Sequence, residues 1–197
     1  MKLFEPLPFT VVYKGRAYPI KPFFDYVLRV FDIFQQKDLP IENRVDLALY
    51  VIAPKARIKE ADKPEFLNAV FDLLMGKSET RETQRSMDMV QDADLIFASF
   101  YQAYTIDLYK MQGKLHWLSF RMLLQNLPQD APLMRVIEVR TKPLPTPTKY
   151  NQKEIATLMR LKSKYRLELT QEEREEQLQK GLAKIAMTLE AMANRKD

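Results

Sequence analysis

The sequence predicts a mainly α-helical fold. We expect a compact multi-helix domain with a small N-terminal β-hairpin, then a proline-rich linker and a C-terminal helical arm. Apolar residues recur at helical spacing over most of the 197 residues, two β-prone runs flank a glycine near the start, and three alternating prolines interrupt the pattern late in the chain. These observations predict a core domain over residues 1–141, a linker over 142–148 and an arm over 149–197.

The composition agrees with a globular helical protein. Hydrophobic residues make up 46% and charged residues 29% of the chain. The absence of cysteine excludes disulfides and thiolate sites and fits a reducing cytosol. Residues 1–10 show no signal-peptide pattern, and the longest apolar run, 47–54, is far shorter than the roughly 20 residues that span a bilayer. We therefore expect a soluble cytoplasmic protein without a membrane partner.

The first half of the chain reads as a hairpin and three helices. The hairpin spans residues 11–20, with Gly15 in its turn and Pro19 ending one arm. Helices are expected from Pro22 to about residue 36, from Pro40 to Pro54, and from Pro64 to Gly76. The second of these places Ile41, Val45, Ala48, Leu49 and Ile52 on one apolar stripe. The polar stretch 77–85 is expected to be an exposed loop.

Further helical patterns follow this loop. Asp92 or Asp94 is expected to cap a fourth helix, and a fifth, over 114–127, is apolar over so wide an arc that we expect it at the centre of the domain. A short element follows around residues 133–139. Most aromatic residues at helical spacing are expected in the core: Phe24, Phe31, Phe71, Phe97, Phe100, Trp117 and Phe120.

Three prolines separate the C-terminal arm from the core domain. Pro143, Pro145 and Pro147 forbid helix and favour an extended spacer. One helix is expected around residues 155–161, and the capping box of Thr170 and Glu173 opens another. Large apolar residues of this last helix recur in alternating steps of three and four, which predicts a partner-binding stripe: Leu178, Leu182, Ile185, Leu189 and Met192.

No set of residues indicates catalysis, a cofactor or a metal. The single histidine, His116, lies on a strongly apolar helix and is expected to be structural. Asp88, Asp92 and Asp94 immediately precede a helix, where negative side chains are favoured by capping and by the helix dipole. The four glycines are too far apart for a phosphate-binding loop, and no serine has a glycine-flanked turn. We predict a non-enzymatic protein.

A basic stretch is the main argument for nucleic acid. Its charges are Lys149, Lys153, Arg160, Lys162, Lys164 and Arg166, with Tyr150 and Tyr165 among them. The sign reverses directly afterwards at Glu168, Glu172, Glu173, Glu175 and Glu176. Adjacent blocks of opposite charge more often neutralise each other, along a helix pair or between subunits, so the sequence favours a protein partner over nucleic acid.

Two segments resemble a phage protein family. They are residues 92–108, DADLIFASFYQAYTIDL, and 115–128, LHWLSFRMLLQNLP, supported by Tyr18-Pro19-Ile20 and by VIEVR at 136–140 before Pro143. The resemblance covers roughly residues 10–145. It is to a tail assembly chaperone-type family of siphophages and prophages of Gram-positive bacteria, encoded between the major tail protein and the tape measure protein. Where a glycine would be expected before Ile106, this chain has Thr105, which should affect loop geometry more than role.

The resemblance implies a role in tail assembly. Such chaperones keep the long, apolar tape measure protein soluble, help tail tube subunits polymerise around it, and are often made in two forms by ribosomal frameshifting. It implies the tape measure protein, and possibly the tail tube protein, as partners in the host cytoplasm, with self-association and no place in the mature virion. The alternatives left open are a structural virion component and a nucleic-acid-binding regulator.

Overall fold

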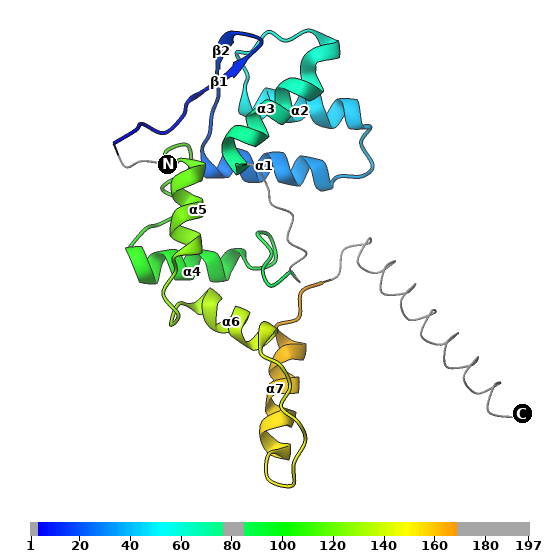
Figure 1. Cartoon of the computed structure of the whole chain (residues 1–197), viewed down its shortest axis with the longest axis vertical. Coiled ribbons are helices and arrows are strands. Elements are labelled where there is room, and N and C mark those ends of the chain that lie inside the picture. The colour runs from blue at the N-terminus through cyan, green and yellow to red at the C-terminus, as the bar shows by residue number, and fades with distance from the viewer. Residues whose placement is uncertain (1–3, 77–84, 169–197) are drawn as a thin grey trace, which may run out of the picture. The chain divides into compact units, whose positions relative to one another are not determined.

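The computed structural model describes residues 4–76 and 85–168, which fall into two compact units (Figure 1). One unit ends at Glu138 and the other begins at Val139. The first unit contains a two-stranded sheet, five α-helices with one short 3-10 helix, and most of a sixth α-helix. Its elements are β1 (Thr10–Tyr13), β2 (Arg16–Pro19), α1 (Phe24–Gln35), α2 (Ile41–Ile52), η1 (Glu60–Asp62), α3 (Lys63–Met75), α4 (Ala93–Tyr104), α5 (Trp117–Gln125) and α6 (Pro132–Thr141). The predicted mainly helical class with an N-terminal hairpin is confirmed.

The hairpin forms where the sequence predicts it. β1 and β2 are antiparallel, and Lys14 and Gly15 form the turn between them with positive φ angles of 46° and 74°. A two-residue turn needs positive φ angles if it is to match the twist of the strands. Alternate residues of β1 are buried, so the hairpin has one apolar face. The Tyr13 and Tyr18 rings meet Phe66 of α3 edge-on, at 5.5 and 5.2 Å between centroids. The hairpin therefore packs on α3, as Figure 1 shows.

The helices α1, α2 and α3 begin and end close to the predicted positions. α2 begins directly after Pro40, and α3 has Pro64 in its first turn and Gly76 at its C-cap, with a φ of 74° that suits glycine. Ile41, the first residue of the predicted apolar stripe, lies in the first turn of α2 and is 49% exposed. The buried part of that stripe is Val45, Ala48 and Ile52.

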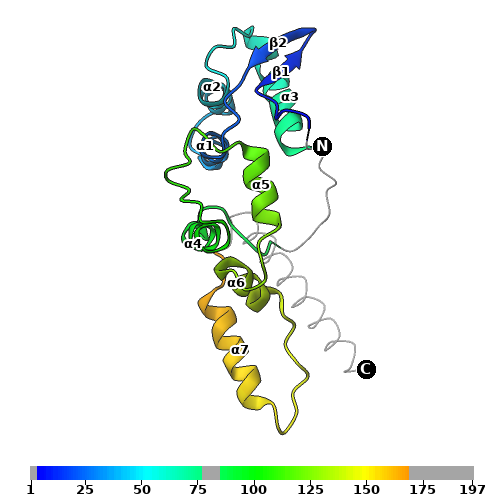
Figure 2. The ribbon, with the colours of Figure 1, turned by 90° about the vertical axis from the view of Figure 1, so that its left-hand side faces the viewer.

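The helix α5 is central, as its wide apolar arc predicts. It contacts α1, α3 and α4, and Figures 1 and 2 both place it between α1 and α4. The Phe120 ring stacks on Phe24, Phe100 and Trp117, with centroids 5.0, 5.1 and 5.6 Å away. The predicted aromatic core is confirmed, since Phe31, Phe71 and Phe97 also pack against it while keeping part of their surface exposed.

Hydrogen bonds of two side chains, Arg121 and Ser99, hold the helices of this unit in place. The Arg121 guanidinium donates to the carbonyls of Leu74 and Met75 at 2.9 and 2.8 Å, which joins α5 to the end of α3. The fully buried Ser99 hydroxyl donates to the Leu95 carbonyl and accepts from the Leu133 amide, at 2.6 and 2.9 Å. This serine is therefore a structural link between α4 and the first turn of α6.

The second unit is described from Val139 to Glu168. Its proline-rich segment is not helical, and α7 (Gln152–Lys164) follows it. Asn151 closes the turn before α7, since its side chain accepts from the Thr148 amide and donates to the Thr146 carbonyl, at 2.7 and 2.9 Å. The end of α6 and the end of α7 are joined by Arg140, whose Nε donates to the Tyr165 carbonyl at 2.6 Å. The domain boundary predicted at 141/142 stays a prediction.

Candidate protein-binding surface

The connection from α4 to α5 builds one side of an apolar pocket in the first unit. It leaves α4 at Thr105, whose backbone is left-handed, and turns at Asp107, whose carboxylate accepts from the amides of Tyr109 and Lys110 at 3.1 and 3.2 Å. The Gly113 amide donates to the Asp25 carboxylate on α1 at 2.9 Å. These bonds hold the connection against α1 and fix where the Tyr109 side chain lies.

His116 anchors the other end of this connection. Its Nδ1 accepts from the Leu118 amide at 3.1 Å and caps α5, while its Nε2 lies 2.9 Å from the Pro8 carbonyl, to which it donates as the neutral imidazole. Burial lowers the pKa of this imidazole, and the bond to Pro8 opposes that effect. Both ring nitrogens are used in holding the chain, so the predicted structural role is confirmed.

The fifth helix begins later than predicted because of the same segment. The Phe24 amide donates to the Leu115 carbonyl at 3.0 Å, and the Trp117 amide donates to the Pro22 carbonyl at 2.7 Å. Residues 115–116 are therefore extended and pair with the chain before α1, and α5 runs from Trp117 to Gln125 in place of 114–127. Long-range backbone pairing overrides the helical periodicity here.

Asp88 and Asp92 form hydrogen bonds within the turn before α4. Asp92 occupies the N-cap position but does not cap the helix with its side chain, so that prediction is wrong. Its buried carboxylate accepts from the Asp88 amide at 2.9 Å, and Asp88 accepts from the amides of Val90 and Gln91, both at 2.8 Å. Because the carboxylates satisfy the tight turn that precedes α4, they are not available to the helix. Asp94 lies in the first turn of α4, where the helix dipole favours it.

The pocket itself lies among α1, α4, α5 and the connection, and has a volume of about 170 Å³. Its polar groups are confined to Gln112 and Tyr109; the complete lining is Phe24, Leu28, Met89, Ala93, Ile96, Phe97, Leu108, Tyr109, Gln112 and Phe120. Cavities of about 150 Å³ hold a benzene-sized group. The pocket can therefore take one large apolar side chain.

Aromatic rings extend from the mouth of the pocket onto the surface. The Phe97 ring lies 5.3 Å from Tyr109 and stacks on Tyr101 at 6.2 Å between centroids. Tyr109 is 71% and Tyr101 56% exposed. We call Phe97, Tyr101 and Tyr109 the aromatic rim. An apolar pocket with an exposed aromatic rim is typical of a protein-binding site, because the rings provide large contact area and little side-chain entropy is lost.

Neither a metal-ion cluster nor a membrane-spanning helix is found in the described ranges. No three histidine, aspartate or glutamate side chains there are grouped so that they could hold a metal ion. Nor does any helix in these ranges combine the length and the apolar character needed to cross a membrane.

The surface found here is not the one predicted. The predicted partner-binding residues Leu178, Leu182, Ile185, Leu189 and Met192 lie outside the residues that the structure describes, as does most of the expected loop at 77–85. The aromatic rim was missed because Phe97 follows the helical period of the core, and Tyr109 lies in a connection where periodicity carries no information. The closely spaced aromatics of α4 were the only available signal.

Comparison with known proteins identifies the family of the chain. The family model described as Bacteriophage Gp15 protein matches residues 3–167, which is most of the chain. The chain belongs to this bacteriophage family. Membership suggests a phage structural or assembly-related protein. The family match includes the aromatic rim, the pocket and α7. Searches of curated proteins and of solved structures gave no match.

Proposed function

We propose that this chain is a non-catalytic tail assembly chaperone that binds amphipathic helices of the tape measure protein in the host cytoplasm and assists tail tube assembly. The observation that carries the proposal is the apolar pocket with its aromatic rim, in a chain of a bacteriophage family. A client helix would insert one large apolar side chain into the pocket and lay its neighbours, three or four residues away, across the rim.

The charged groups near the pocket already have partners within the chain. Asp25 and Asp107 are engaged by backbone amides, and Lys110 is paired with Asp107 at 3.4 Å. Because these charges already have partners within the chain, the apolar area is the main attraction that this surface offers to a partner. This is the surface a chaperone needs if it is to hold many similar apolar helices in turn.

Co-expression with a tape measure protein from the same phage tests the proposal. The soluble fraction of the tape measure protein should rise when the intact chain is present and should fall again with Tyr109→Ser. Tyr50→Ser is the matched control, because Tyr50 is 76% exposed on α2 and does not line the pocket. Equal solubility with and without the intact chain, or equal loss with both variants, would contradict the proposal.

A structural virion component is the alternative, and particle composition separates the two. A chaperone is released when the tail is complete, so mass spectrometry of purified particles should not detect this chain. Detection at a fixed copy number per tail would favour the structural component.

A further inference from the structure

The net positive charge of the chain lies beyond residue 138. Residues 1–138 carry eighteen basic and eighteen acidic side chains, whereas residues 139–197 carry thirteen basic and eight acidic ones. The acidic block at 172–176 is included in this count, so it does not cancel the excess, and the whole +5 charge remains in this part of the chain. A local excess of one sign attracts partners of the opposite sign. The second unit is therefore suited to an anionic partner.

The helix α7 carries three of these positive charges on one face. Lys153, Arg160 and Lys164 are exposed and lie within about 40° of one another around the helix axis, on the side opposite the buried Leu158. From Lys153 to Lys164 the helix rises about 16 Å, a length along which a nucleic acid strand carries several phosphates. We call these three residues the basic face of α7.

The basic face has no counter-charge within the residues that the structure describes. No carboxylate of residues 4–76 or 85–168 forms an ion pair with Lys153, Arg160 or Lys164. The Lys164 ammonium lies 5.2 Å from the centroid of the Tyr165 ring, a contact that leaves its charge unneutralised. Like charges on one helix face repel each other, so an anion placed there removes an unfavourable interaction as well as adding a favourable one.

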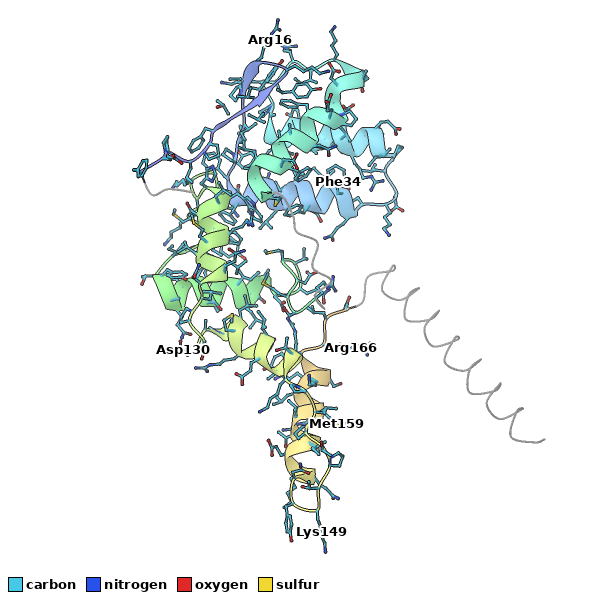
Figure 3. All side chains as sticks on the ribbon, viewed as in Figure 1. Arg16, Phe34, Asp130, Lys149, Met159 and Arg166 are labelled. Atoms are coloured by element: carbon cyan, nitrogen blue, oxygen red, sulfur yellow. The ribbon has the colours of Figure 1, made fainter. Side chains whose placement is uncertain are left out.

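Further basic side chains and an exposed aromatic ring flank the helix. Lys149 and Arg166 are exposed and lie just before and just after α7, as their labels in Figure 3 show. Tyr150 is 96% exposed and lies between Lys149 and Lys153 in the sequence. A ring this exposed contributes little to the packing of its own unit, and its face is free to stack on a base.

We propose that the second unit binds single-stranded nucleic acid. The basic face of α7 contacts phosphates, Lys149 and Arg166 extend this contact, and the Tyr150 ring stacks on a base. Basic side chains that follow the backbone, combined with an aromatic ring for the bases, are typical of proteins that bind single strands without sequence preference. Stacking on Tyr150 needs an unpaired base, so a single strand fits better than a duplex. This activity is separate from the client binding proposed for the pocket of the first unit.

The chemistry of the face favours nucleic acid over a protein or a membrane. Protein interfaces have an apolar centre and few lysines, whereas the basic face consists of two lysines and one arginine. Met159 is the one exposed large apolar residue of α7, and it lies about 100° around the helix from the nearest of these charges. A membrane-binding helix needs a free apolar side, but Leu158 on the apolar side of α7 is buried within the protein.

Fluorescence anisotropy of a labelled oligothymidylate of about twenty nucleotides tests the proposal with the full chain. Binding should be detected at about 50 mM salt and should weaken steeply as salt is added. Lys153→Gln/Arg160→Gln/Lys164→Gln should lower the affinity about tenfold or more and reduce the salt slope by about 2, since each lost phosphate contact removes about 0.7. Tyr150→Ala should lower the affinity about fivefold or more but leave the slope unchanged, because stacking releases no counterion.

A matched control variant separates the basic face from the general charge of the chain. Lys55→Gln/Arg57→Gln/Lys59→Gln also removes two lysines and one arginine, and these side chains are exposed in the first unit. It should leave the salt slope unchanged. Tyr109→Ser should leave oligonucleotide binding unchanged, because the pocket takes no part in it, so failure of this proposal and failure of the chaperone proposal are distinguishable.

A charge-preserving exchange separates loss of charge from loss of structure. Lys153→Arg/Arg160→Lys/Lys164→Arg keeps all three charges and should keep the binding. No binding at about 50 mM salt, or equal loss in the two triple glutamine variants, would overturn the proposal. Poly-glutamate that displaces the oligonucleotide at equal charge concentration would assign the face to an acidic protein segment instead. A duplex bound as tightly as the single strand, with no effect of Tyr150→Ala, would also overturn it.

Discussion

Replacing Thr105 with glycine should stabilise the first unit. Thr105 ends α4 with a left-handed backbone, φ 57° and ψ 26°, and its amide donates to the Tyr101 carbonyl at 3.0 Å. This conformation is common at helix ends but is normally adopted by glycine, because a Cβ atom crowds the following carbonyl. A branched side chain makes the crowding worse.

The size of the effect follows from two opposing contributions. Relief of the left-handed conformation contributes about 1–2 kcal/mol. The greater freedom of glycine in the unfolded chain removes about 0.4–1 kcal/mol of this gain. The Thr105 side chain is exposed, so little packing is lost. We expect a net gain of about 0.5–1 kcal/mol, or about 2–4 °C in Tm for a unit of this size.

Tryptophan fluorescence during urea unfolding measures this change. The chain has one tryptophan, Trp117, and it is buried in the first unit, so its signal reports on that unit. Asn68→Gly, at an exposed right-handed position of α3, is the matched control and should lower the unfolding midpoint. A Thr105→Gly variant that unfolds at the same or a lower urea concentration than the original chain would refute the reasoning.

Three further predictions concern the contacts that hold the first unit. Ser99→Ala leaves the buried Leu133 amide without its acceptor and should cost about 1–3 kcal/mol in urea unfolding, whereas exposed Ser163→Ala should cost almost nothing. Burial lowers the pKa of His116 from its ordinary 6.5, so the folded chain takes up this proton less readily than the unfolded chain. The free energy of unfolding should therefore be highest above pH 6.5 and should fall as the pH drops towards 5. This fall should be smaller in His116→Asn. Arg121→Ala removes two charged hydrogen bonds at the end of α3 and should lower stability by about 1.5–3 kcal/mol, measured by the same unfolding experiment; an unchanged midpoint would show that water replaces them.

The local elements were predictable because their causes are local. Pro40 and Gly76 mark helix ends through backbone geometry alone, and the turn at Gly15 needs a positive φ that glycine supplies. The central position of α5 was also predictable, because a helix that is apolar over a wide arc must be covered on several sides.

The errors occur where two structures compete for the same groups. Residues 115–116 read as the first turn of a helix, but their backbone pairs with residues 22–24. The Asp92 carboxylate is suited to cap α4, but it accepts a hydrogen bond from the Asp88 amide in the preceding tight turn. In both cases a competing hydrogen bond decides between two acceptable local structures.

The sequence by itself determined the helices, the hairpin and the proline-rich break, since periodicity and turn chemistry are properties of neighbouring residues. Only the tertiary structure decided that Phe97 and Tyr109 line one pocket while Tyr101 stacks on Phe97, because that depends on where α1, α4 and the connection meet. It also decided that α7 keeps Lys153, Arg160 and Lys164 on the face opposite its buried leucine. Which side chains form the surface depends on which of them are covered by packing.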